Sequence, residues 1–377
     1  MSPHRLLSAC GIALFLAAWL PGAWPPAMAQ DYPAVLDNHR IELPRDHGSH
    51  PAFRTEWWYV TGWMSAGGGR EMGVQITFFR NRPGIAEDSS SSFAPKQLLF
   101  AHAALADPEA GRLLHDQRSA RAGFGIARAE QGRTDVRIDD WSLVLEGATY
   151  VARIAAREFD LELRFSATQG VLLQGHNGYS RKGPRAGQAS YYYSRPQLAL
   201  TGSVTLRPDS GTPRGGARKM QVEGRAWLDH EWSSQAMAEE AVGWDWIGIN
   251  LDDGGALMAF RMRDAGGGVF WAGGTHRSAG GRVRVLRPAE VHFTPLRRWR
   301  SPRTGADYPV AMRVRIGQVQ SAGMIIELEP VMEDQELDSR ASTGTVYWEG
   351  AVRVRRGGKP VGRGYLELTG YWQPLKL

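Results

Sequence analysis

Apolar and polar residues alternate along most of this chain, with the period of two that is typical of half-buried strands. Glycine, proline, aspartate and serine separate the alternating segments at the spacing of antiparallel turns. Helical periodicity is nearly absent, and residues 233–242 could form only a turn or two. We therefore predict an all-β protein, with strands within 71–80, 136–147, 159–167, 198–206, 220–228, 256–264, 282–286, 312–316, 324–330, 345–355 and 365–372.

A stretch rich in proline, glycine and basic residues, 207–219, has no apolar period and offers the best domain boundary. The chain is too long for one ordinary core, and each side of this stretch carries about the eight to ten strands that close a barrel. Tyrosine or tryptophan shortly precedes a glycine-marked strand late in both halves, which agrees with a duplication. We expect two tandem antiparallel barrels, one spanning 30–210 and the other 211–377.

The first 29 residues resemble a signal peptide, with a short basic start, an apolar run and an Ala-x-Ala cleavage site after Ala29. Cys10, the single cysteine, lies before most of the apolar run, so it is a poor lipidation site and leaves with the leader. No later stretch is apolar for long enough to cross a bilayer. We expect an exported, periplasmic or secreted protein that has neither disulfides nor thiol chemistry.

The net charge of +6 comes almost entirely from scattered arginines. No block of basic residues interleaved with aromatics indicates nucleic-acid binding, so we expect none. The basic balance, with a sequence pI of about 9.5, could instead favour an anionic envelope surface or an envelope transporter. We expect a monomer.

The densest chemistry lies in "WLDHEWSS", 227–234, followed by "GWDWIGIN", 243–250. If the first run is extended, Trp227, Asp229 and Glu231 share one face, and His230 shares the other with Leu228 and Trp232. A turn at Asp229-His230 would instead gather all three ionisable groups. Histidine beside carboxylates in a dry aromatic setting suits general acid–base catalysis. A buried ion-pair network between the barrels explains the same residues equally well.

In "RTEWWYVTG", 54–62, Glu56 and Trp58 share one strand face. Glu56 is either paired with an arginine in a packed strand or desolvated inside a barrel lined by aromatics. "YYYSRP", which contains Tyr192, lines a cavity or packs the core. "GYSRK" around Ser180 resembles a nucleophile elbow but lacks its last glycine.

We expect no metal and no cofactor. The run "HEWSS" lacks the second histidine of a zinc-protease helix, and "HGSH", 47–50, has no carboxylates at ligand spacing. Neither a phosphate-binding loop nor a dinucleotide fingerprint is present.

Several of these motifs occur together and in order: "EWWYVTG", "GHNGYSRKG", "SYYYSRP", "AWLDHEWSS", "GWDWIGINLDDG", "RSPRTGADYP" and "VYWEGAVRV" with "GYLELTGY". From 31 to 377 the chain resembles the predicted secreted hydrolases of the AttH/CrtC lipocalin-like group, which includes carotenoid 1,2-hydratase. The resemblance implies two packed lipocalin-like β-barrels, each able to enclose an apolar ligand. Carotenoid hydratases add water across an alkene without a cofactor, which requires an acid that protonates carbon. Their His-x-Trp element matches His230 and Trp232, and their aspartate best matches Asp245.

These observations predict an exported two-barrel protein that acts on a small hydrophobic, isoprenoid or lipid-like molecule by hydratase, hydrolase or isomerase chemistry. The expected proton carriers are His230, Asp229, Glu231 and Asp245. The residues expected to shape the ligand cavity are Glu56, Trp58, Tyr192, Trp232, Trp244 and Trp246. The alternative is a periplasmic carrier without catalysis, in which the ionisable cluster holds the barrels together.

Overall fold

The alternating segments form antiparallel strands, and the all-β prediction is confirmed. The computed structural model describes residues 32–208, 216–235, 237–317 and 323–375. The predicted leader and its cleavage site after Ala29 lie outside these residues. The helical segments described are single 3-10 turns, and none of them is long and apolar enough to span a membrane. They are η1 (Arg45–His47), η2 (Gly67–Gly69) and η3 (Pro288–Glu290).

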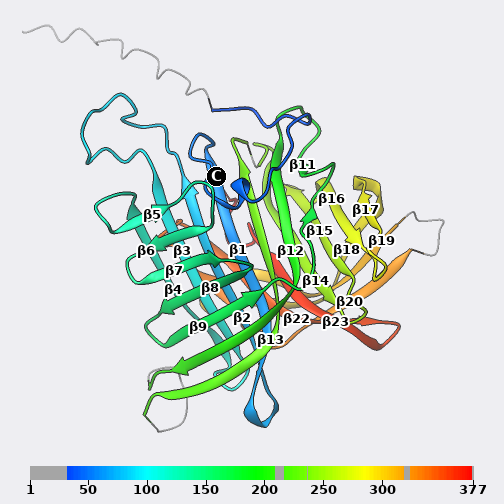
Figure 1. The fold of residues 1–377 in the computed structure, drawn as a ribbon. Helices are drawn as coiled ribbons and strands as arrows, with labels where there is room; N and C mark the ends of the chain where they lie inside the picture. Colours follow the sequence, from blue (N-terminus) through cyan, green and yellow to red (C-terminus); the bar gives the residue numbers. More distant parts are fainter. Residues whose placement is uncertain (1–31, 209–215, 236, 318–322, 376–377) are drawn as a thin grey trace, which may run out of the picture. The chain divides into compact units, whose positions relative to one another are not determined.

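In the described residues the first sheet has thirteen strands and runs β4-β3-β2-β1-β13-β12-β9-β8-β7-β6-β5, with β10 and β11 also paired to β12 (Figure 1). Its ends approach each other where β6 contacts β3 and β4, so the sheet nearly closes into a barrel. Strand β9 shows why these sequences form strands, because its buried residues alternate with more exposed ones along its whole length. The bounds are β1 (Thr55–Ala66), β2 (Arg70–Asn81), β3 (Leu98–Asp107), β4 (Arg112–Arg121), β5 (Ala127–Ala129), β6 (Asp135–Ile138), β7 (Trp141–Glu146), β8 (Thr149–Ala155), β9 (Phe159–Ser166), β10 (Leu172–Leu173), β11 (Tyr179–Arg181), β12 (Ala189–Leu206) and β13 (Arg218–Ser233).

The second sheet has ten strands in the described residues and runs β17-β16-β15-β14-β23-β22-β20-β19-β18, with β21 paired to β22. Its bounds are β14 (Ala241–Leu251), β15 (Ala256–Asp264), β16 (Val269–Arg277), β17 (Val283–Leu286), β18 (Val291–Arg300), β19 (Asp307–Ile316), β20 (Met324–Pro330), β21 (Glu336–Asp338), β22 (Val346–Arg356) and β23 (Lys359–Leu368).

The boundary expected at 207–219 connects β12 to β13, which pair with each other in the first sheet. The chain passes from the first sheet to the second between Ser233 and Ala241, later than the expected boundary. The "DHEW" run therefore lies at the end of the last strand of the first sheet, directly before the crossing.

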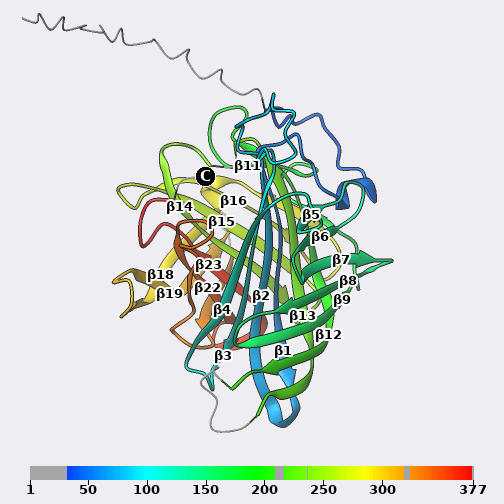
Figure 2. The ribbon, with the colours of Figure 1, turned by 90° about the vertical axis from the view of Figure 1, so that its left-hand side faces the viewer.

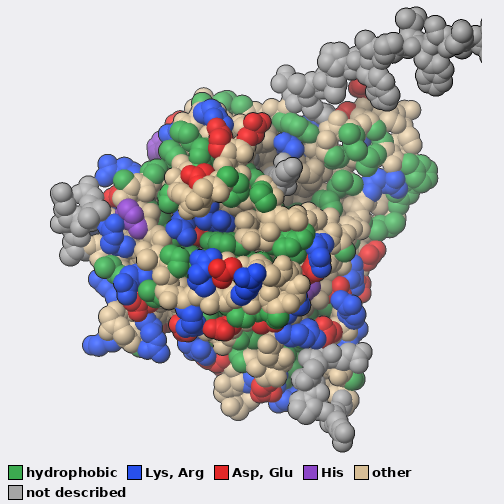
Figure 3. All heavy atoms as spheres, turned by 180° about the vertical axis from the view of Figure 1, so that it is seen from behind, with side chains coloured by type: hydrophobic (Ala, Val, Ile, Leu, Met, Phe, Trp, Pro, Cys, Tyr) green, Lys and Arg blue, Asp and Glu red, His purple; other side chains and the backbone are tan. Residues whose placement is uncertain are grey.

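The two sheets face each other through β1, β2, β12 and β13 on one side and β14, β22 and β23 on the other (Figures 1 and 2). A separate apolar cluster fills this layer, and it is rich in aromatic rings such as Tyr59, Trp63, Trp227, Trp246 and Tyr347. Each sheet also has its own interior core. On the outer surface, basic and acidic side chains are interspersed (Figure 3). This layer buries several ionisable residues, and the interior of the first sheet buries others.

Candidate active site

Strand β13 is extended through the whole "WLDHEW" run, so the extended alternative holds and no turn gathers the three ionisable groups. Residues 229–232 pair in continuous register with β1 on one side and β12 on the other. Because side chains alternate along a strand, Asp229 and Glu231 face the second sheet, whereas His230 and Trp232 face the interior of the first. The run "WLDHEW" thus places ionisable residues at two separate sites, one between the sheets and one inside the first sheet.

A cavity of about 400 Å³ lies between the sheets, and its walls are mostly aromatic and apolar. Residues at alternate positions line it, as the strand geometry requires. The first sheet contributes Trp57, Tyr59, Phe79, Phe100, His102, Lys182, Tyr192, Asp229 and Glu231, and the second contributes Trp244, Trp246, Phe260, Met262, Ser342, Tyr347, Glu349 and Glu367. A volume near 400 Å³ is in the usual range for small-molecule sites, and the apolar walls suit a hydrophobic ligand.

Asp229 is buried on the cavity wall, where three side chains donate hydrogen bonds to its carboxyl group. The Tyr192 hydroxyl donates to Oδ2 at 2.6 Å, the Trp227 indole N–H donates to Oδ1 at 2.6 Å, and the Ser194 hydroxyl also donates to Oδ1. Burial raises the pKa of Asp229 more than these donors lower it, to about 7. At neutral pH this carboxyl group can therefore both give and take a proton.

Two further carboxyl groups, Glu349 on β22 and Glu367 on β23, are directly opposite each other in the ladder. Burial, and then repulsion from Glu367, hold the pKa of Glu349 well above its usual value. Burial also raises the pKa of Glu367, to about 8, with Asp229 and Glu231 adding to the effect. The Tyr59 hydroxyl donates to Glu349 Oε2 at 2.6 Å. Because like charges this close cannot all ionise in a dry site, at least one of the two glutamates keeps its proton at pH 7.

The ammonium of Lys182 offsets the remaining negative charge. Its Nζ lies 2.9 Å from Glu231 Oε1, and it stands over the rings of Tyr192 and Phe260 at 4.8 and 4.4 Å from their centroids. Lys182 is 6% exposed and Glu231 is 4% exposed, so the pair is almost fully desolvated. A broken pair would leave a buried charge, which is expensive.

His230 lies on the other face of β13, in a buried cluster below the N-terminal segment. Its Nε2 is 2.8 Å from Glu56 Oε1 and its Nδ1 is 3.1 Å from the Tyr193 hydroxyl, while its ring stacks on Trp58. Burial lowers the pKa of His230. Glu56 also accepts from Arg80 Nε at 2.8 Å, so the predicted arginine partner of Glu56 is present. Arg80 also lines the cavity, but Glu56 and His230 do not.

Trp232 fixes the N-terminal segment to the same cluster. The ring of His50 stacks on Trp232 with a centroid distance of 3.7 Å, and its Nδ1 lies 2.7 Å from Glu56 Oε1. Burial alone would lower the pKa of His50, but the carboxylates of Glu56 and Asp46 give a net rise. The arrangement holds η1 and its flanks against the barrel.

His50, Glu56 and His230 are also the described residues that could hold a metal ion, since their ligand atoms lie within 4.8 Å of one another. Both oxygens of Glu56 are already hydrogen-bonded, and the Arg80 guanidinium supplies a positive charge at 2.8 Å. A cation placed here would face that charge, so the donor set fits a hydrogen-bonded cluster better than a metal.

Asp245 is separate from both groups. It points away from the cavity, between Trp244 and Trp246, and accepts from Arg261 Nε at 2.6 Å, Arg263 Nε at 3.0 Å and the Tyr371 hydroxyl at 2.9 Å. All its oxygen contacts are within the second sheet and its C-terminal extension.

The structure therefore divides the residues singled out in the sequence. Asp229, Glu231, Tyr192, Trp244 and Trp246 line one cavity, whereas Glu56, Trp58, His230, Trp232 and Asp245 do not. Glu349, Glu367, Lys182, His102 and Tyr59 were not identified from the sequence. The alternation in "VYWEGAV" and "GYLELTG" does place one glutamate on a buried strand face in each segment. That signal could have identified Glu349 and Glu367.

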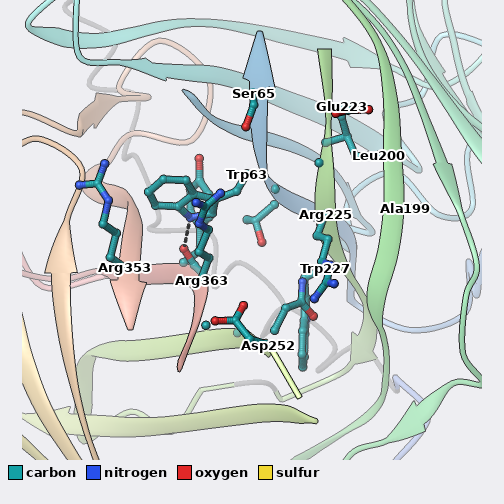
Figure 4. Close-up of a pocket in the computed structure, with 18 of the residues that line it drawn as sticks. Trp63, Ser65, Ala199, Leu200, Glu223, Arg225, Trp227, Asp252, Arg353 and Arg363 are labelled. Atoms are coloured by element: carbon teal, nitrogen blue, oxygen red, sulfur yellow. Dashed lines mark hydrogen bonds between the residues drawn. The ribbon is translucent and has the colours of Figure 1, made fainter. Parts of the chain in front are cut away.

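A second hollow, of about 620 Å³, opens at another part of the layer between the sheets (Figure 4). Its wall combines Trp63 and Trp227 with Arg225, Arg353 and Arg363. The Trp63 indole donates to the Gly364 carbonyl, and the guanidinium groups of Arg353 and Arg363 lie over its ring and share Glu71 as a partner. These contacts hold Trp63, Arg353 and Arg363 together. Burial raises the pKa of Tyr365, which also lines the hollow, well above its usual value. The smaller cavity is the better candidate for chemistry.

Comparison with known proteins agrees with this architecture. The AttH-like family matches residues 34–371. The crystal structure of a putative AttH from Nitrosomonas europaea has 49% identity and a TM-score of 0.81, covering 90% of this chain and 99% of that one. Kievitone hydratase from Nectria haematococca has 17% identity and a TM-score of 0.66, covering 88% and 94%. CghA with Sch210972 has 13% identity and a TM-score of 0.52, covering 84% and 88%.

At such low identity, the likeness to kievitone hydratase and CghA extends to the fold alone. No curated protein matches this chain. The family match spans nearly all of the described residues, and the Nitrosomonas protein matches at high identity over almost its full length. This chain belongs to the AttH-like family.

Proposed function

We propose that this protein binds a small unsaturated hydrophobic molecule between its two sheets and adds water to it by cofactor-free acid–base catalysis. The observation that carries the proposal is the set of carboxyl groups on the cavity wall. Burial raises the pKa of Asp229 to about 7 and that of Glu367 to about 8, and holds the pKa of Glu349 well above its usual value. A carboxylic acid kept neutral at pH 7 inside an apolar cavity is the reagent that protonation of an alkene needs.

The chemistry divides between the two sides of the cavity. Glu367 or Glu349 donates a proton to one alkene carbon, which leaves a carbocation at the other. The faces of Trp57, Trp244 and Trp246 can stabilise that positive charge. Water then attacks the cation, and its proton passes to Asp229, whose three hydrogen-bond donors hold the carboxylate in place. Transfer of that proton back to the glutamate restores the site.

The lining indicates the substrate class. Apolar and aromatic side chains dominate the wall. Its two cations, the Lys182 ammonium and the Arg80 guanidinium, are paired with Glu231 and Glu56. An isoprenoid or lipid-like alkene suits these walls better than a charged metabolite. Hydratase names among proteins of the same fold, such as kievitone hydratase, support this chemistry.

The test combines turnover and binding. Purified protein is incubated in water enriched in ¹⁸O with a panel of isoprenoid alkenes, and mass spectrometry follows uptake of one oxygen atom. We expect a hydrated product from the wild type, and a loss of about 10²–10⁴-fold in Asp229→Asn and in Glu367→Gln. The matched control is Glu162→Gln, on the exposed side of β9, which should retain full turnover.

Binding of N-phenyl-1-naphthylamine, followed by its fluorescence, shows whether a variant that has lost turnover still binds a ligand in the cavity. Asp229→Asn should keep the affinity for this probe. Wild-type protein that binds the probe and copurifies with an unchanged lipid, but hydrates no alkene of the panel, would contradict the proposal and favour the carrier. We further propose that this activity is exported, as the leader-like N-terminus predicts.

A further inference from the structure

A serine and a histidine outside the carboxyl group cluster meet on the same cavity wall. Ser342 lies in the turn between β21 and β22, and His102 lies on β3 of the other sheet. The hydroxyl oxygen of Ser342 is 2.9 Å from His102 Nε2, and the Tyr347 hydroxyl is 2.6 Å from His102 Nδ1. A hydroxyl, an imidazole and a third group that orients the imidazole form the arrangement that activates a nucleophile.

His102 is the base that lies within hydrogen-bonding distance of the serine, and its burial makes it a weaker base than a free imidazole. It is 1% exposed and packs against the edge of the Phe79 ring at 5.2 Å. Burial lowers the pKa of His102 to about 3, so its ring is neutral across the physiological range. When Nδ1 donates its N–H to the Tyr347 oxygen, Nε2 is left to accept from Ser342.

The serine is accessible from the cavity. Ser342 is half-buried and lines the same space as Phe100 and Tyr347. The single hydrogen of this hydroxyl points to Gln117 Oε1 at 2.6 Å, and Ser339 O lies 3.2 Å from the same oxygen. The reaction therefore requires the O–H to turn from Gln117 to His102, and it requires the His102 tautomer whose proton is on Nδ1.

We propose that Ser342 and His102 form a second catalytic centre, which hydrolyses carboxylic esters that have an apolar acyl group. This activity is independent of the carboxyl chemistry proposed above, and it uses no group of that mechanism.

The proposed hydrolysis proceeds through an acyl-serine intermediate. Ser342 Oγ forms a bond to the ester carbonyl carbon while its proton passes to His102 Nε2. The C–O bond to the alcohol then breaks, and His102 returns the proton to the leaving oxygen. Water attacks the acyl-serine, gives one proton to His102, and releases the carboxylic acid as Ser342 regains its hydrogen.

The experiment uses the full chain with p-nitrophenyl butyrate as substrate and a fluorophosphonate as label. We expect phosphonylation at Ser342, located by peptide mass spectrometry. Ser342→Ala should abolish the labelling and lower ester hydrolysis to the background rate, and His102→Gln should lower hydrolysis about 10²–10⁴-fold. Between pH 5 and pH 8 the titration of His102 should add no pH dependence to the wild-type kcat/KM, because the imidazole remains neutral throughout.

Ala341→Ser, which adds a hydroxyl at an exposed position of the same turn, is the matched control. It should keep wild-type hydrolysis, whereas Ser342→Ala combined with Ala341→Ser should stay inactive, because the moved hydroxyl has no histidine. Ester hydrolysis at the wild-type rate in Ser342→Ala, or no label on Ser342 in folded protein, would overturn the proposal. If His102→Gln does not fold, hydrolysis and labelling of Ser342→Ala, which is the smaller change, still test the proposal.

Discussion

Replacement of Asp229 by asparagine should change how the stability of the protein depends on pH. The carboxyl group is 2% exposed, and burial raises its pKa to about 7 from an ordinary value of 3.8. The native state therefore holds this proton more tightly than the unfolded chain does. The stability that this proton contributes is fully present below pH 3.8, and it is lost as the pH rises towards 7.

The size of the effect follows from the shift. A difference of about 3 pKa units at about 1.4 kcal/mol each amounts to about 4 kcal/mol between pH 4 and pH 8. Asparagine does not titrate, so its free energy of unfolding should lack this decline. It also removes a charge that raises the pKa of Glu367, and this effect acts in the same direction. The variant loses the acceptor for the Tyr192 hydroxyl, but that cost is the same at every pH.

The measurement is urea unfolding at pH 4, 6 and 8, followed by tryptophan fluorescence and circular dichroism on wild type and Asp229→Asn. The variant minus wild-type difference should rise by about 4 kcal/mol across this range. Ser166→Ala, which removes no ionisable group from the exposed side of β9, should give a difference that does not change with pH. Parallel curves for wild type and Asp229→Asn would show that the buried carboxyl group ionises at its ordinary pKa, which would refute the basis of the proposed acid.

Three further outcomes can be measured separately. His230→Gln should lower the free energy of unfolding by about 3–5 kcal/mol while folded protein keeps its turnover, because His230 lies in the Glu56 cluster and not on the cavity wall; urea unfolding and the hydration assay check this. Gly248→Ala should weaken binding of N-phenyl-1-naphthylamine at least tenfold, because an added Cβ would lie 2.4 Å from the Trp246 ring and push that ring into the cavity. Fluorescence titration measures this affinity, and an unchanged affinity would show that the ring moves without entering the cavity. We predict that the leader is removed and that the mature chain begins at Gln30; intact mass of envelope-fraction protein that retained the leader or carried a lipid on Cys10 would contradict this.

The sequence indicates the strands well because period-two alternation is local. It also separates Asp229 and Glu231 from His230 and Trp232 once the segment is known to be extended. It does not show which face meets a ligand, because that depends on which face of β13 the second sheet covers. The resemblance of His230 and Trp232 to a family element therefore indicated the inner face of β13, which packs against the N-terminal segment and not against the cavity.

Contacts distant in sequence were harder to predict. Glu349 and Glu367 are cross-strand neighbours through the register of β22 and β23, and a slip of one residue would separate them. Lys182 reaches Glu231 from the loop region after β11, and Tyr59 reaches Glu349 across the two sheets. Each of these contacts depends on how the sheets pack, so no spacing along the chain encodes it.

The alternation on β13 also decides how a mutation here must be interpreted. Asp229 and His230 are joined by one peptide bond, yet their side chains serve a cavity between the sheets and a cluster inside the first. A substitution of His230 that destabilises the end of β13 also displaces Asp229. Turnover would then fall together with stability, although the histidine contacts no ligand. Turnover must therefore be divided by the folded fraction. Only a His230 variant that stays folded, binds the probe and still loses turnover would place proton transfer on the inner face of the strand.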